Sequence, residues 1–256
     1  MKKGQMKGQV TFFAVVGLML VLFVLLYIAS SFFLPAAIQK QVISSSSHQS
    51  LVSFIDSCIS QTSKLALFFF GFVGGDVQPP AYPSFFSYDE RYKIPYLYQQ
   101  GKFIVLTSEF AQDVLEKYVD AHLQKCTRGF TSFPQFSITE ELPRTKVSIL
   151  DDEVVFSVFY PVFVVEDKAK LLLDPNYSAR IPVVMKEMLQ IANHIVELGR
   201  SDPLLIHWDY LTDVSSKAYN ITTYAERDKT MVYRIVDIEH EVIGEPYILQ
   251  FAVKAE

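Results

Sequence analysis

The longest apolar stretch of the chain covers residues 10–34 and contains no charged residue. A helix that crosses a bilayer needs about 20 apolar residues. A lone crossing segment must be helical, because unpaired backbone groups are costly in hydrocarbon. A secretory signal has a shorter apolar core of roughly 7–15 residues, and a buried core helix of this length normally has a polar face. The pattern therefore predicts a transmembrane helix over 10–34.

The charges on either side of this stretch give its orientation. Lys2, Lys3 and Lys7 precede it, and its far side has no charged residue before Lys40. Positively charged flanks remain in the cytoplasm. We therefore expect a basic cytoplasmic leader over 1–9 and a single-pass protein of the cell membrane. Its C-terminal domain is expected to be extracellular. The lipid bilayer is the first expected partner of the protein.

Residues 35–75 continue with helical periodicity and predict a stalk helix. Pro35 can kink or end the membrane helix at the surface. The four serines at 44–47 weaken helical bonding, and Gly71 and Gly74 are expected to mark its C-terminal end. The apolar stripe with a spacing near 3.6 residues comprises Ile38, Val42, Leu51, Phe54, Ile55, Cys58, Ile59, Leu65 and Phe69.

The remaining residues, 76–256, predict an α+β domain with a mostly antiparallel sheet and two or three helices. Four of the twelve prolines lie in 76–101 and predict an extended, aromatic-rich loop there. We expect helices over 107–126, with Thr107 or Ser108 as the cap, and over 182–198, with Pro182 at its start.

Alternating apolar and polar residues predict the strands of this domain. Residues 146–150 and 154–165 are expected to form a hairpin, with Pro161 on a strand edge. The turn over 226–229 is expected to join two further strands. The other expected strands cover 171–173, 204–207, 219–224, 231–238 and 247–253.

The charge balance argues against nucleic acid as a partner. The chain has 256 residues and a formal net charge of −5. Apart from Lys2, Lys3 and Lys7, it has 20 basic and 28 acidic residues. Binding to nucleic acid or anionic lipid calls for clustered lysines and arginines, and the sequence contains no basic run.

The chain has two cysteines, Cys58 and Cys126. Two thiols are too few for a structural zinc site. In an oxidising exterior they are a candidate disulfide, with two buried free thiols as the alternative. Asn176 and Asn220 each begin an Asn-X-Ser/Thr triplet and are candidate glycosylation sites on an external domain.

Lys7-Gly8-Gln9, followed at once by the apolar stretch, resembles the class III signal peptide of archaeal type IV pilin-like proteins. The resemblance covers the N-terminal region only. It implies that a prepilin peptidase cuts between Gly8 and Gln9, although Lys3-Gly4-Gln5 repeats the same tripeptide. It also implies contact with copies of the chain through the N-terminal helix, as in a surface filament.

One position departs from this family's pattern. Pilin-like proteins usually carry a glutamate four residues after the glutamine, which is thought to pair with a neighbouring subunit, and this chain has Phe13 there. That difference favours an anchored monomer over a filament subunit. The remainder is similar to uncharacterised single-span archaeal membrane proteins that begin with KGQVT.

The sequence predicts no catalytic, cofactor-binding or metal site and no cofactor. It contains no Walker A, GxGxxG, GxSxG or HExxH motif. His122 lies four residues before Cys126, but no third group completes a nucleophilic site. We therefore expect a non-enzymatic structural or binding protein, with a pilin-like filament subunit as one form. A monomeric bitopic receptor or adhesin and an anchored extracytoplasmic enzyme are the alternatives.

Overall fold

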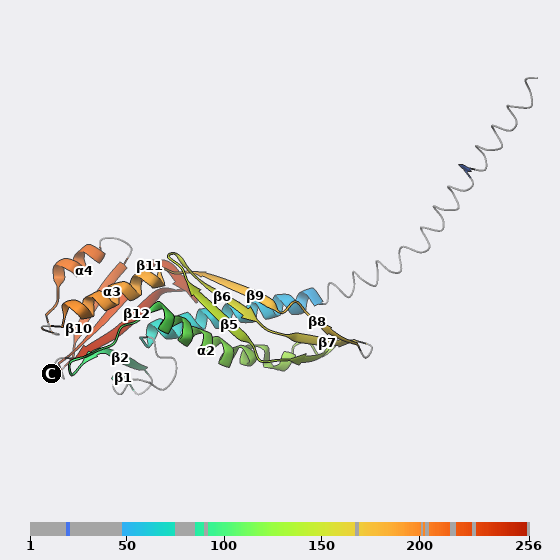
Figure 1. Ribbon diagram of the computed structural model, residues 1–256, viewed down its shortest axis with the longest axis horizontal. Helices are drawn as coiled ribbons and strands as arrows, with labels where there is room; N and C mark the ends of the chain where they lie inside the picture. The colour runs from blue at the N-terminus through green and yellow to red at the C-terminus, as the bar shows by residue number, and fades with distance from the viewer. Residues whose placement is uncertain are drawn as a thin grey trace, which may run out of the picture. The chain divides into compact units, whose positions relative to one another are not determined.

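The structure is a computed structural model in which the chain divides into two compact units, Met1–Ser53 and Phe54–Glu256. The second unit contains the labelled helices and strands of Figure 1. The described residues are 19–20, 48–74, 85–89, 92–166, 169–200, 202, 205–215, 219–226 and 229–254.

Several features expected of the N-terminal region lie outside the described residues. They are the leader over 1–9 with Gly8 and Gln9, the start of the stalk over 35–47, and the span over 10–34 except Met19 and Leu20, which are helical. Within the part of the chain that the structure describes, no helix is both long and apolar enough to cross a membrane.

The second unit begins within a helix described over residues 48–72, which lies inside the range predicted for the stalk helix. Its residues Ile55, Ile59, Ala66, Leu67 and Phe70 are almost fully buried and lie four, seven, one and three positions apart. This spacing places them on one side of the helix, which therefore contributes a continuous stripe to the core.

The C-terminal end of this helix packs closely against β12 (Glu245–Lys254). A Cβ atom at Gly71 would overlap the backbone carbonyl of Ile248, so the helix approaches the strand through a residue without a side chain. The side chain of Gln250 donates a hydrogen bond to the carbonyl of Phe72. Gly74 follows with φ of +65°, and the helix ends there as predicted.

Helix α2 (Ser108–Thr127) runs antiparallel to the 48–72 helix. Cys58 is bonded to Cys126, whereas Phe69, further along the first helix, has its ring 5.9 Å from that of Tyr118, earlier in α2. The α2 helix covers almost the predicted range, and the Thr107 hydroxyl accepts a hydrogen bond from the Phe110 N–H over 3.1 Å, as expected of a cap.

The largest sheet has six strands in the order β1-β2-β12-β11-β10, with β3 (Lys102–Phe103) paired to β2. Strands β2 and β12 are parallel, and the other described pairs of this sheet are antiparallel. Its remaining strands are β1 (Phe85–Asp89), β2 (Tyr92–Gln99), β10 (Tyr219–Ala225) and β11 (Thr230–Val242).

Two smaller antiparallel sheets have three strands each, in the orders β5-β6-β9 and β4-β7-β8. Helix α2 packs on β5, and α3 packs on β12 of the large sheet (Figure 1). The fold is therefore α+β with mostly antiparallel pairing, as the sequence predicted. The strands of the two smaller sheets are β4 (Ser137–Glu140), β5 (Arg144–Ile149), β6 (Glu153–Phe159), β7 (Val162–Glu166), β8 (Ala169–Leu172) and β9 (Asn176–Pro182). The two C-terminal helices are α3 (Met185–Leu198) and α4 (Trp208–Ser215).

The strand expected over 154–165 is two strands in different sheets. β6 ends at Phe159 and β7 begins at Val162. Pro161 has no N–H to donate to a ladder. The backbone N–H of the preceding residue, Tyr160, donates to the Pro175 carbonyl over 2.8 Å. The chain therefore leaves one small sheet and enters the other at Tyr160 and Pro161.

Three further expectations were wrong. The segment over 76–101 contains two strands in place of the expected loop. Pro95 lies in β2 opposite the first residue of β1, at the end of the ladder between these strands, where a missing N–H costs least. Pro182 ends strand β9 rather than opening a helix, and α3 begins at Met185. Residues 205–207 are not a strand, and helix α4 follows them.

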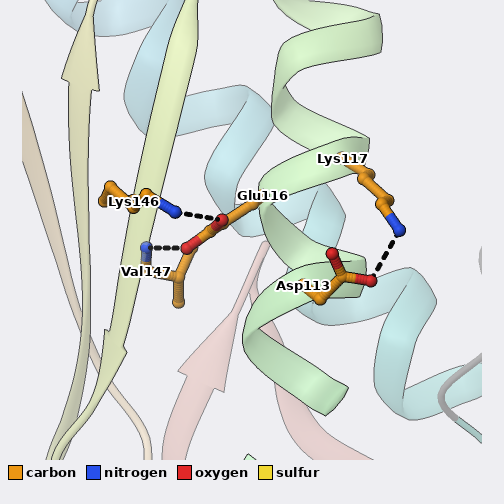
Figure 2. A network of polar contacts seen from close by, with 5 residues as sticks. All are labelled: Asp113, Glu116, Lys117, Lys146 and Val147. Carbon is orange, nitrogen blue, oxygen red and sulfur yellow. Dashed lines mark hydrogen bonds and ion pairs between the residues drawn. The ribbon is translucent and has the colours of Figure 1, made fainter. Parts of the chain in front are cut away.

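Glu116 joins α2 to β5 (Figure 2). Its carboxylate accepts hydrogen bonds from the Val147 backbone N–H at 3.0 Å and from the Lys146 Nζ at 3.1 Å. On the same helix, Lys117 and Asp113 form an exposed pair 2.7 Å apart that contacts no other element in the figure. The two carboxylates therefore provide a matched comparison between a bridging role and a surface role.

We expect Glu116→Ala to lower the free energy of unfolding by about 1.5–3 kcal/mol, because it leaves a partly buried N–H without its charged acceptor. Asp113→Ala removes only an exposed i,i+4 pair and should cost less than about 0.5 kcal/mol. Urea denaturation followed by circular dichroism measures both. Equal losses in the two variants would contradict the bridging role of Glu116.

Candidate functional site

A groove with a cavity volume of about 460 Å³ lies between the first helix of the second unit and the C-terminal half of α2. We call it the helix groove. It is lined by side chains from both helices and from the turn that follows α2, namely Phe54, Ser57, Cys58, Gln61, Thr62, Leu65, Tyr118, His122, Lys125, Cys126, Thr127, Arg128 and Ser132.

The disulfide between Cys58 and Cys126 lines this groove and joins its two helices. The bonded residues have Cα atoms 5.6 Å apart and are separated by 68 positions in the sequence. The pairing expected from the sequence is therefore present. It also removes the Cys126 thiol, so the Cys–His nucleophile considered for His122 and Cys126 has no free sulfur.

His122 and Tyr118 stack against each other on the α2 side of the groove. Their ring centroids are 4.1 Å apart and the ring planes differ by 8°. The Nδ1 atom of His122 lies 2.9 Å from the backbone carbonyl of Tyr118. A carbonyl only accepts hydrogen bonds, so Nδ1 carries the proton in this contact and Nε2 is left for another partner. Burial raises the pKa of the Tyr118 hydroxyl.

Lys125 and Arg128 place two positive charges at the same end of the groove. Both residues are exposed, and Arg128 has a left-handed backbone with φ of 47° at the C-cap of α2. Cations at this end of a helix interact favourably with its dipole. The residues that line the groove include no aspartate or glutamate, so no carboxylate pairs with these cations within it.

A polar network of Thr127, Glu140 and Tyr160 lies beside the groove. The buried Tyr160 hydroxyl donates a hydrogen bond to Glu140. The Thr127 hydroxyl lies 3.4 Å from the same carboxylate oxygen of Glu140 and 3.1 Å from the Gln124 carbonyl. Burial raises the pKa of Glu140. The network joins the end of α2 to β4 and to the break between β6 and β7.

A second hollow, with a volume of about 630 Å³, lies on the outer side of the β5-β6-β9 sheet. Its cations already have partners, since Lys146 pairs with Glu116 and the Arg144 guanidinium lies 5.3 Å from the Phe159 ring centroid. The candidate glycosylation residue Asn176 also lines it, and its amide donates to Asp174 over 3.1 Å.

Both candidate glycosylation asparagines are exposed. Asn176 begins β9 and Asn220 lies in β10, so they belong to different sheets and form no common site. Their hydroxyl partners in the triplets, Ser178 and Thr222, are exposed as well. Exposure is what modification of either asparagine requires, and the modification itself stays a prediction.

The other histidines contribute to packing or local polar contacts. His194 lies against the Tyr210 ring with a centroid distance of 4.5 Å, and His240 pairs with the buried Asp237 at 2.8 Å. In the described part of the chain, no three histidine, cysteine, aspartate or glutamate side chains are grouped so that they could hold a metal ion.

The helix groove was not predicted from the sequence. His122, Lys125 and Arg128 follow one another at three-residue intervals, which places them along one side of a helix end. This spacing was visible in the sequence. The other wall of the groove comes from residues near Cys58, more than sixty positions earlier, and only the tertiary fold brings it there.

The chain matches no known protein-family model, and neither a curated protein nor a solved structure matches it.

We expect the variant Cys58→Ser/Cys126→Ser to lose about 4 kcal/mol of unfolding free energy, because the bond closes a long loop in the unfolded chain. Chemical denaturation of the variant and of the oxidised and reduced parent chain measures this effect. Reduction should destabilise the parent and leave the double variant unchanged. A parent chain that is equally stable with and without reductant would contradict this prediction.

Proposed function

We propose that the chain is a membrane-anchored extracytoplasmic protein with a structural or binding role. In this proposal residues 10–34 form the anchor, the stalk helix predicted over 35–75 leads into the domain, and the second unit, Phe54–Glu256, lies outside the cell. The observation that carries it is the uncharged run over 10–34 with lysines on one side only. Two single-span forms of the proposal differ in what happens to the leader.

The disulfide supports the outside location of the domain. Structural disulfides persist in oxidising compartments and are rare in a reducing cytosol. Both cysteines of the chain are used in the bond between Cys58 and Cys126. The bond also joins the 48–72 helix to α2.

The first form is a pilin-like subunit, supported by the resemblance of Lys7-Gly8-Gln9 to a class III signal peptide. A prepilin peptidase would remove the leader, and the helix over 10–34 would pack with copies of itself. The second form is an anchored receptor or adhesin, supported by Phe13 in place of the expected glutamate. A mature mass that begins at Gln9 favours the first form, and an intact N-terminus favours the second.

We expect an amine-reactive reagent that does not cross membranes to label Lys117 and Lys146 on intact cells. Their side chains are 66% and 84% exposed. The same reagent should label Lys2, Lys3 and Lys7 only after lysis, if the leader is retained, and peptide mass spectrometry reads each lysine separately. Labelling of Lys117 and Lys146 only after lysis would contradict the proposed topology.

A further inference from the structure

The helix groove has an excess of positive charge that the rest of the chain does not share. The chain as a whole carries a formal charge of −5, yet Lys125 and Arg128 line a groove that includes no carboxylate. Among the described residues, neither cation forms an ion pair. Their charges are therefore available to a ligand. We propose that the helix groove binds the oxyanion group of a small hydroxylated ligand, either a carboxylate or a phosphate.

The positions of the polar groups fit such a ligand. Arg128 and Lys125 supply the charged donors that carboxylate and phosphate oxygens prefer. Because Nδ1 donates to the Tyr118 carbonyl, the Nε2 atom of the neutral His122 ring accepts a hydrogen bond from a hydroxyl group of the ligand. The volume of about 460 Å³ is within the range of small-molecule pockets.

The opposite wall supplies neutral hydrogen-bonding groups. Ser57, Gln61 and Thr62 line it from the first helix, and Ser132 lines the groove from the turn after α2. Hydroxyl and amide groups bind uncharged polar groups, so this wall is suited to the hydroxyl groups of the ligand. One side of the groove therefore recognises charge and the other recognises a hydroxylated body.

The groove is held in place before a ligand arrives. The disulfide fixes the distance between its two helices, and the Tyr118 ring supports the imidazole of His122. The Thr127 hydroxyl holds the end of α2 through the Gln124 carbonyl. A site that needs little ordering loses less free energy on binding.

Among the residues that the structure describes, the second hollow has no cation without a partner. Its Lys146 is paired with Glu116, and its Arg144 stacks on Phe159.

The inference goes beyond the proposed function, because it names a ligand class and does not depend on where the domain is located. An empty groove would leave the proposed topology unaffected, and a cytoplasmic domain would leave oxyanion binding unaffected.

Titration calorimetry of the full chain in a non-ionic detergent tests the proposal with three probes: glucuronate, inorganic phosphate and glucose. We expect at least one oxyanion to bind at least about tenfold more tightly than glucose, because charge-assisted hydrogen bonds are the stronger ones. Tighter binding of glucuronate identifies a carboxylated saccharide, and tighter binding of phosphate identifies a phosphorylated ligand. No binding of either oxyanion at millimolar concentration would overturn the proposal.

Matched variants locate the binding site. Lys125→Gln and Arg128→Gln should each weaken binding of the preferred oxyanion about tenfold. Lys117→Gln removes the same charge from the same helix, outside the lining of the groove, and should leave the affinity unchanged. Circular dichroism checks that each variant is folded. An equal loss in Lys117→Gln, or no loss in the other two, would show that the groove is not the site.

Discussion

The covalent pairing of the 48–72 helix with α2 is the contact on which the other parts of the second unit depend. The disulfide between Cys58 and Cys126 closes one end of this helix pair. At the other end, Gly71 lets the first helix approach β12, while Glu116 attaches α2 to β5. These two sheet contacts therefore involve the same pair of helices, and a change in the spacing of the pair would alter the packing of the large sheet and of the β5-β6-β9 sheet.

The helix groove is a consequence of the same pairing. Two helices joined at one point by a disulfide leave a groove between their side chains. Lys125 and Arg128 line this groove, and its lining includes no carboxylate. The same helix pair therefore both supports the second unit and forms the walls of the groove.

Local patterns in the sequence predicted those elements that depend on local interactions. The Thr107 cap and the periodicity of α2 were predicted, as was the hairpin of β5 and β6. Strands β1 and β2 were missed because the prolines of 76–101 indicated a loop, and because the parallel pairing of β2 with β12, about 150 residues later, leaves no local pattern. The groove was missed for the same physical reason, since its two walls come from distant segments and no local pattern records their meeting.

The redox state of Cys58 and Cys126 in the chain as it is made by its native cell tests the central claim most directly. Native cells are lysed in the presence of an alkylating reagent, and the intact mass is measured with and without prior reduction. The account predicts no alkylation before reduction and two alkylated cysteines after it. Two alkylated cysteines before reduction would show that the helix pair is not covalently closed, and it would place the domain in a reducing compartment.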